Sequence, residues 1–228
     1  MMTPHAAALE RDLGRLRKLR GEGGSVPVRL HEVKGFQSAR LRATYADIAE
    51  LPRYRAATAF FLDDLYGPKD FSGRDAAMMR IVPVMSRVLP DSAVETAALA
   101  IELEALSESL DQRLATALPE GPIGGAGYAA AYRKSSTPAE REHQIALIEA
   151  VGERLDALVK KPFVYGTLKL MRKPAHMAGL TDLQDFLERG FASFREMHGA
   201  DQFMALIGER ERAILSDLFS GKPLVFPA

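Results

Sequence analysis

Acidic, basic and phenolic side chains gather around one turn of the chain, the corner Tyr66-Gly67-Pro68. They are Asp63, Asp64, Tyr66, Asp70, Arg74, Asp75 and Arg80. A carboxylate beside a phenol could exchange a proton with a bound molecule, so the corner could be an enzyme site or a small-molecule pocket. That pocket would be lined by Asp64, Tyr66, Asp70 and Arg74. The residues could instead form arginine–carboxylate ion pairs that lock two helices. Because such networks also occur without catalysis, we expect Tyr66, Asp70 and Arg74 to join the helices on either side of the corner.

Glu140 and His143 have the spacing that puts a carboxylate and an imidazole on one face of a helix, where they could bind a metal. A two-metal bundle needs a second such pair, and the chain has none; Glu102 is an acid that another helix could add. Glu140 also fits a capping box that begins at Thr137, where it would accept a hydrogen bond at the start of a helix. We therefore expect Glu140 to be a capping residue, and no bound metal.

His176 is the residue that could bind haem iron, since one imidazole is enough for a proximal ligand in an all-helical protein. The chain contains no cysteine, so haem could not be attached through a Cys-x-x-Cys-His motif. A single histidine that closely follows Pro174 is more typical of a surface turn or a helix cap. We expect no cofactor of any kind.

The charges of the chain balance at 30 basic and 30 acidic residues, but they are unevenly distributed. The balance argues against a nucleic-acid-binding protein, which usually carries a basic excess. Residues 91–118 are mostly acidic. Residues 160–176 contain no acid, and their basic residues are Lys160, Lys161, Lys169, Arg172 and Lys173. We expect these surfaces to be paired within the fold or across a dimer. The alternative is that the basic segment binds an anionic ligand or a membrane surface.

The composition of the chain excludes several further kinds of site and of segment. The chain has 228 residues, 47% of them hydrophobic, and no cysteine. It therefore has no disulfide, no thiolate metal site and no cysteine nucleophile. No stretch approaches the roughly 20 apolar residues that span a bilayer, and the first residues lack the apolar run of a signal peptide. We expect a cytoplasmic protein without a transmembrane segment.

Apolar residues recur at helical spacing through most of the chain, and no segment shows the alternation typical of a strand. We expect an all-α fold, a single-domain bundle of roughly eight to ten helices, with the bundle proper in residues 28–228. Residues 1–27 should form a basic helix and a glycine-rich link, an arm that packs loosely or onto another chain. The apolar stripe of this first helix is Leu9, Leu13 and Leu16. Two later helices should begin with capping threonines, Thr137 and Thr181.

Two stretches of the chain are similar to a known family. The pattern Phe-Phe-Leu-x-Asp-Leu-Tyr-Gly-Pro-x-Asp-Phe-x-x-Arg-Asp occupies residues 60–75. Ala-Gly-Leu at 178–180 is followed by Leu-Gln-Asp-Phe-Leu-Glu-Arg-Gly-Phe at 183–191. Together they resemble an uncharacterised family of bacterial all-helical proteins, a domain of unknown function, over most of the chain. The resemblance implies a bacterial origin and one shared architecture. It implies no catalytic residue, since that family has no assigned activity.

No serine nucleophile elbow, zinc-protease helix or set of kinase motifs occurs in the chain. We therefore expect a non-enzymatic binding protein that acts through self-association or a protein partner. A homodimer is favoured by the basic first helix, the acidic residues 91–118 and the apolar tail 224–226. Such a tail would fray unless a second chain or its own core covered it. The alternative is small-molecule binding or catalysis at the corner.

Overall fold

The computed structural model describes residues 3–21, 26–65, 77–78, 80–82 and 90–226. Within these residues there are twelve helical elements and no strand. The expected all-α fold is therefore confirmed, with slightly more helices than expected. None of the helices in the described part of the chain is long and apolar enough to cross a membrane.

The helices follow one another with short connections. Their bounds are α1 (Pro4–Leu19), α2 (Leu30–Thr44), α3 (Ala46–Glu50), α4 (Pro52–Phe60), the π-helix η1 (Phe61–Leu65), α6 (Asp91–Ala117), α7 (Gly125–Ser135), α8 (Pro138–Val159), α9 (Pro162–Leu170), α10 (Arg172–Met177), α11 (Thr181–Met197) and α12 (Asp201–Phe219).

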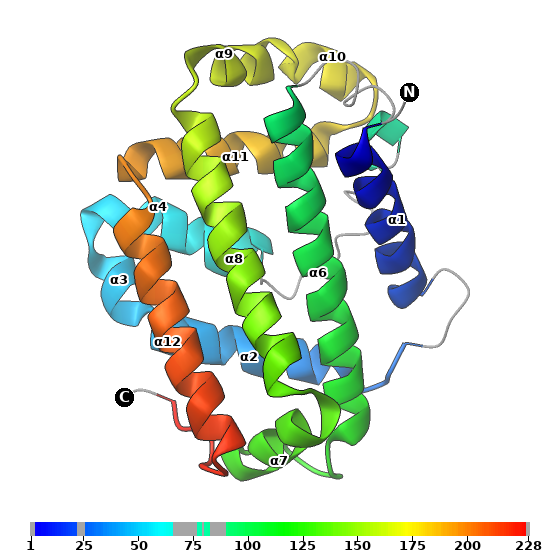
Figure 1. The fold of residues 1–228 in the computed structure, drawn as a ribbon, viewed down its shortest axis with the longest axis vertical. Helices are drawn as coiled ribbons and strands as arrows, with labels where there is room; N and C mark the ends of the chain where they lie inside the picture. Colours follow the sequence, from blue (N-terminus) through cyan, green and yellow to red (C-terminus); the bar gives the residue numbers. More distant parts are fainter. Residues whose placement is uncertain (1–2, 22–25, 66–76, 79, 83–89, 227–228) are drawn as a thin grey trace.

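Two layers of helices build the molecule (Figure 1). α12, α8, α6 and α1 stand side by side in that order, and each contacts its neighbour. α2, α4 and α11 cross behind them, where α2 contacts α6 and α11 contacts both α4 and α8. α9 and α10 lie at one end of the layers, and α7 lies at the other. The core therefore lies between the layers, with helices at both ends.

The first helix is part of the packed fold. Leu9, Leu13 and Leu16 are fully buried, because α1 lies along α6 with its leucine stripe inward. Arg20, directly after the helix, pairs with Glu104 of α6 at 2.6 Å. The expectation of a loosely packed arm is therefore wrong, since apolar burial and an ion pair both hold α1 to α6. The division of the chain at residue 27 stays a prediction.

The apolar tail after α12 docks on its own chain. The Leu224 amide donates a hydrogen bond to the Gly125 carbonyl at 3.2 Å. A Cβ atom at Gly125 would come 2.0 Å from the Leu224 carbonyl oxygen, so this close approach needs a glycine. The Phe226 ring lies 5.2 Å from that of Phe36 in α2. Of the two coverings considered for the tail, docking on the chain's own core applies to Leu224, while Val225 stays 75% and Phe226 40% exposed.

The two threonines expected to cap helices differ. The Glu140 amide donates to the Thr137 hydroxyl at 3.2 Å, and the Glu140 carboxylate accepts from the Thr137 amide at 2.8 Å, so the capping box is confirmed. Thr181 is instead the first residue inside α11, after Leu180, and its side chain caps nothing. Gly179, at φ +68°, lies in the turn just before this helix. The expectation for Thr181 is therefore wrong.

Replacing Thr137 with alanine should lower the free energy of unfolding by about 1 kcal/mol, because the Glu140 amide loses its acceptor. Denaturant titration followed by circular dichroism measures the difference. Thr181→Ala is the matched control, since this threonine makes no capping hydrogen bond and its loss should change stability little. Equal losses in the two variants would contradict the capping role of Thr137.

Candidate functional site

The aspartates that precede the corner form ion pairs between helices. The Asp64 carboxylate, on a residue 9% exposed, accepts hydrogen bonds from Arg189 Nη2 at 2.9 Å and from Arg189 Nε at 3.2 Å. This bidentate pair joins α11 to the π-helix η1. Asp63 pairs with Arg42 of α2. Both carboxylates therefore connect helices, which agrees with the structural interpretation of the corner.

The remaining members of the expected cluster are only partly described. Four of them lie outside the described residues, namely Tyr66, Asp70, Arg74 and Asp75. The expected network of Tyr66, Asp70 and Arg74 therefore stays a prediction. Arg80 is described, and its Nη2 donates a hydrogen bond to the Gly179 carbonyl at 3.2 Å. This contact ties residue 80 to the turn between α10 and α11.

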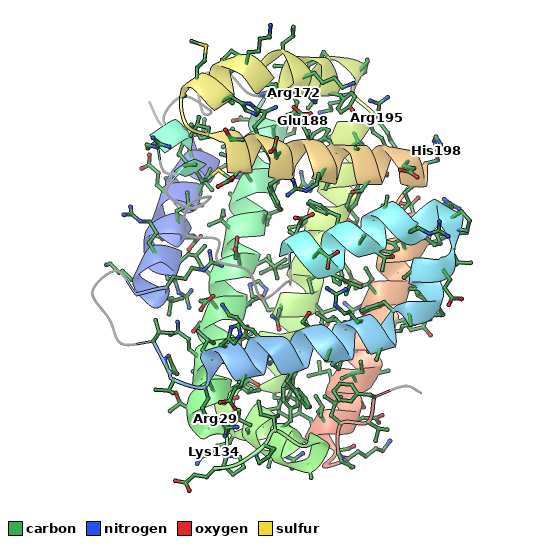
Figure 2. All side chains as sticks on the ribbon, turned by 180° about the vertical axis from the view of Figure 1, so that it is seen from behind. Arg29, Lys134, Arg172, Glu188, Arg195 and His198 are labelled. Carbon is green, nitrogen blue, oxygen red and sulfur yellow. The ribbon has the colours of Figure 1, made fainter. Side chains whose placement is uncertain are left out.

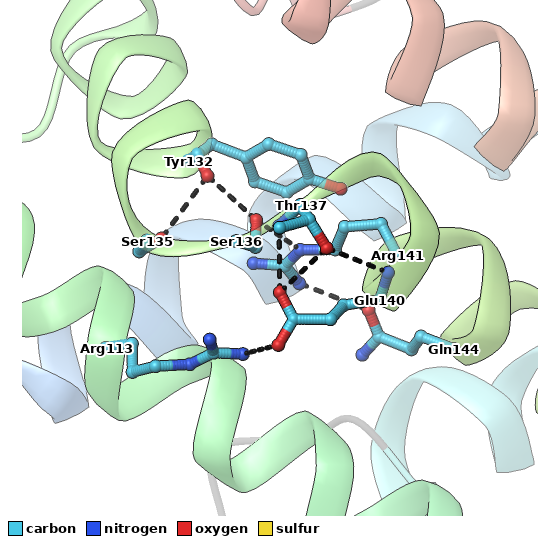
Figure 3. Close-up of polar contacts among 8 residues, drawn as sticks. All are labelled: Arg113, Tyr132, Ser135, Ser136, Thr137, Glu140, Arg141 and Gln144. Carbon is cyan, nitrogen blue, oxygen red and sulfur yellow. Dashed lines mark hydrogen bonds and ion pairs between the residues drawn. The ribbon is translucent and has the colours of Figure 1, made fainter.

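The candidate metal ligands of α8 have partners within the protein. Glu140 Oε1 pairs with Arg113 of α6 at 2.7 Å (Figure 3). This ion pair, together with the capping hydrogen bonds, lowers the pKa of the Glu140 carboxyl to about 2. His143 Nε2 lies 3.2 Å from Glu102 Oε1. In the described ranges, no three His, Asp or Glu side chains are grouped so that they could hold a metal ion.

His176, the haem candidate, lies on the surface. Its side chain is 44% exposed, and its Nε2 lies 3.8 Å from Oδ1 of Asp185 in α11. It does not line the interior cavity described below. A proximal ligand faces an enclosed haem pocket, so this position does not favour haem binding.

The basic residues of the segment 160–176 mostly contact other side chains of the chain. Figure 2 shows Arg172 of α10 beside Glu188 of α11, and Arg172 Nε lies 2.9 Å from Glu188 Oε1. Lys173 is exposed. The partners of the others are Asp156 for Lys160, Ser92 for Lys161 and the Tyr165 ring for Lys169. None of the partners named here is an acid of residues 91–118, so the expected pairing of the two surfaces stays a prediction, as does the anion-binding patch.

A cavity of about 1030 Å³ lies between the two layers. Apolar side chains of α4, η1, α6, α9 and α11 line most of it, among them Phe60, Phe61, Ile101, Phe163, Leu183 and Phe191. Polar side chains gather at the end near α7, which we call the polar end. Its residues are Lys34, Gln37 and Arg40 of α2, Ser107, Glu108 and Asp111 of α6, Tyr128 and Tyr132 of α7, Arg141 and Gln144 of α8, and Glu211 of α12.

Arg141 brings a buried charge to the polar end. The residue is only 3% exposed. Its Nε donates to Ser136 Oγ and its Nη1 to Gln144 Oε1, both at 3.1 Å (Figure 3). The guanidinium carbon lies 4.1 Å from the centre of the Tyr132 ring. Nη2 has no hydrogen-bond partner among the residues that the structure describes. Since a buried ionic group is normally paired, the unpaired Nη2 sets Arg141 apart from the other cations of the polar end.

Two other cations of the polar end have carboxylate partners. Arg40 pairs with Glu211, whose Oε1 also accepts a hydrogen bond from the Tyr45 hydroxyl at 2.7 Å. Lys34 Nζ lies 2.8 Å from Glu108 Oε2. Burial acts to raise the pKa of Glu108, but the Lys34 ammonium outweighs it and holds that pKa below its ordinary value. These charges are therefore neutralised within the protein.

Asp111 supplies a carboxyl that can change its protonation near neutral pH. Burial raises the pKa of this carboxyl to about 6, against the opposing effects of Arg141, Lys34 and Gln37. Burial likewise raises the pKa of Tyr128, whose hydroxyl accepts a hydrogen bond from Gln37 Nε2 at 3.2 Å. A carboxyl with such a pKa can hold or release a proton at the pH of a cell, which is what proton exchange with a ligand requires.

The sequence alone does not single out this site. Asp111 is one of many acids in residues 91–118, and Arg141 lies inside the candidate metal motif. One signal was available: Arg141 is four residues before Ile145 and seven before Ile148, so a charge interrupts an apolar helical face. That signal indicates a buried polar contact. It does not indicate a cavity.

Comparison with known proteins gives a family and no activity. A family model described as a domain of unknown function (DUF8198) matches residues 17–225. The match includes every cavity-lining residue named above. No curated protein and no solved structure matches the chain. The function therefore has to be argued from the geometry.

Replacing Asp111 with asparagine should make the protein more stable at neutral pH than the wild type. The folded carboxyl, with a pKa of about 6 instead of 3.8, binds its proton more tightly than the unfolded one. Wild-type stability therefore falls as the pH rises through this window. The variant should escape this loss, which amounts to at most about 3 kcal/mol because one pKa unit corresponds to about 1.4 kcal/mol.

Free energies of unfolding measured across the acid to neutral range test this expectation. The extra stability of the variant should vanish at a pH below the pKa of Asp111 in the unfolded chain, because Asp111 of the wild type is then protonated in both the folded and the unfolded state. Glu120→Gln, which removes an exposed carboxylate between α6 and α7, is the control. A difference between Asp111→Asn and the wild type that is independent of pH would refute the assigned protonation.

Proposed function

We propose that this chain, which belongs to the DUF8198 family, binds a small and mostly apolar molecule in the cavity between its two helical layers. The observation that carries the proposal is the cavity itself, about 1030 Å³ in volume and lined by apolar side chains of both layers. Ligand pockets usually measure about 300–1000 Å³ and combine apolar walls with a few polar groups. The cavity has this size and this composition.

The energetics of packing support an occupant. Protein interiors are close-packed, and a buried apolar void costs about 24 cal/mol per Å³. The apolar walls of a cavity this large lose packing contacts unless something fills it. Buried waters need polar partners, which the apolar part of the cavity lacks. A molecule that is apolar over most of its surface avoids this cost.

The proposed activity is binding, in line with the expected non-enzymatic protein, but the partner is a small molecule. The proposed site also differs from the expected corner pocket. Asp64 there is engaged with Arg189, and the pocket stays a prediction because its other residues lie outside the described ranges. A bacterial origin and a cytoplasmic location remain part of the proposal, and the cysteine-free composition supports the latter.

Filling the cavity should abolish binding without unfolding the protein. Ala100 of α6 lines the cavity, so a phenylalanine at this position would occupy part of the ligand's space. The probe is N-phenyl-1-naphthylamine, an uncharged fluorophore whose emission rises in apolar surroundings. We expect the wild type to bind the probe and Ala100→Phe to bind it at least about tenfold more weakly, a loss of about 1.4 kcal/mol.

Ala205→Phe is the matched control for this experiment. Ala205 lies on the exposed side of α12 and does not line the cavity, so its replacement should leave probe binding unchanged. Circular dichroism and denaturant unfolding establish that both variants fold. Either of two results would refute the proposal: a wild type that does not bind the probe, or equal binding by Ala100→Phe.

We propose self-association as a second property, on a separate observation. α9 and α10 expose large apolar side chains that do not line the cavity, with Leu170 at 80% and Met177 at 89% exposure. Exposed apolar patches mark interaction sites. Of the features that favoured a homodimer in the sequence, the first helix packs on α6 and Leu224 docks on its own chain, whereas Val225 and Phe226 of the tail stay exposed. The proposed interface is therefore the α9–α10 surface, in a closed two-fold pair.

Static light scattering at micromolar protein should report about twice the chain mass of 25.0 kDa. Leu170→Glu places a charge in the proposed interface and should give the monomer mass. Val28→Glu is the control, since Val28 is 97% exposed in the segment before α2 and should leave the mass unchanged. A wild type that scatters as a monomer would rule out the pairing under these conditions.

A further inference from the structure

We propose that the ligand is an amphiphile with a single carboxylate headgroup, which Arg141 binds at the polar end while the apolar chain extends between the two layers. This inference rests on the proposed binding function and adds the chemical class of the ligand. Three features of the cavity lining carry it. They are a buried guanidinium nitrogen without a partner, a neighbouring carboxyl that can share a proton, and an extended apolar wall.

The Arg141 guanidinium is held in place by the protein. Ser136 and Gln144 accept hydrogen bonds from two of its nitrogens, and Gln144 in turn donates to Ser107 Oγ at 2.8 Å. The Tyr132 ring centre lies 4.1 Å from the guanidinium carbon and supports one face of the group. Nη2 is left without a partner in the described part of the chain, although Arg141 lines the cavity. A donor fixed in this way loses little entropy when an anion binds to it.

The charges of the lining leave Arg141 and Asp111 as the last cation and carboxylate. Among the described lining residues there are four cations and four carboxylates, and the other three cations pair with the other three carboxylates. When Asp111 is protonated, one ligand carboxylate would compensate Arg141. A dianionic headgroup would bring a second negative charge near Asp111. With Asp111 protonated, a neutral or cationic headgroup would leave the Arg141 charge buried and uncompensated, which is costly.

Asp111 determines the pH at which a ligand carboxylate is accepted. The groups that face it are Lys34 and Gln37 of α2, Glu108 of its own helix, Tyr128 of α7 and Arg141 of α8. A ligand carboxylate at Arg141 adds a negative charge beside Asp111. Two carboxylates that share a site cannot both ionise easily, so one of them keeps a proton. Binding of the ligand should therefore be accompanied by uptake of one proton.

The rest of the cavity fits an alkyl chain. From the polar end, the lining continues along α6 past Ile101 and Ala97 to Leu183 of α11 and Phe163 of α9. These side chains offer no hydrogen bonds, so every methylene group that enters gains only by leaving water. A headgroup at Arg141 and a chain directed toward α9 and α11 would use both parts of the cavity.

Competition against N-phenyl-1-naphthylamine in the full-length protein tests the headgroup. Dodecanoate, dodecanol, dodecyl phosphate and dodecylammonium share one alkyl chain and differ in the headgroup. Dodecanoate should bind about ten- to hundredfold more tightly than dodecanol, as expected for one buried charge-assisted hydrogen bond. From about pH 6 to pH 8, its affinity should fall by up to about tenfold per pH unit, because binding takes up a proton.

Two substitutions test whether Arg141 causes the headgroup preference and whether Asp111 causes the pH dependence. Arg141→Met should bring the ratio of dodecanoate to dodecanol affinity close to one, and Asp111→Asn should remove the pH dependence. Arg154→Met is the control, because Arg154 pairs with Glu95 and does not line the cavity. It should keep both the ratio and the pH dependence. Circular dichroism establishes folding, and the wild-type headgroup and pH series remain decisive where a variant does not fold.

The outcomes separate this inference from the proposed function. If the wild type binds neither the probe nor any of the four compounds, the cavity is not a ligand site and both proposals fail. If the probe and dodecanol bind but dodecanoate has no advantage, only the headgroup inference is overturned. An unchanged ratio in folded Arg141→Met overturns it as well. Tighter binding of dodecyl phosphate or dodecylammonium than of dodecanoate would also overturn the headgroup inference.

Discussion

The start of α8 is the constraint on which the candidate site depends. An α-helix turns by about 100° per residue, so adjacent positions face different directions. The Glu140 carboxylate closes the cap at Thr137 and pairs with Arg113 of α6. These contacts fix both the first residue of α8 and the rotation of the helix about its axis. Arg141, the next residue, is thereby turned into the interior, where it is buried beside Tyr132.

Aromatic rings enclose the polar end from the side of α7. The Phe36 ring lies 4.9 Å from that of Tyr128 and 5.2 Å from that of Phe226, and Tyr132 packs edge-on against Phe219 at 5.7 Å. The rings connect α2, α7, α12 and the tail around the buried charges. Low polarity around a charge strengthens its ion pairs and also raises the cost of leaving it unpaired. The packing that stabilises this end therefore also raises the cost of leaving the Arg141 nitrogen unpaired.

Local patterns predict the helices of this chain, because periodicity and capping involve residues within a turn or two of each other. The all-α fold and the Thr137 cap follow from such patterns. The start of α11 does not, since this helix begins at Thr181 itself, one residue before the capping pattern predicts. The cavity could not be predicted in this way. An apolar residue such as Phe60 or Leu183 has the same spacing whether it faces a neighbour or a cavity, and only the packing of distant helices distinguishes the two.

The two ends of the cavity are held with different strength. Rings and ion pairs fix the polar end, whereas α9 at the other end has no fully buried residue although Phe163 and Leu168 line the cavity. Contacts such as the Arg172–Glu188 pair hold this end to α11. The same two helices expose Leu170 and Met177. The surface proposed for self-association therefore lies at the end of the cavity where α9 contributes no buried residue.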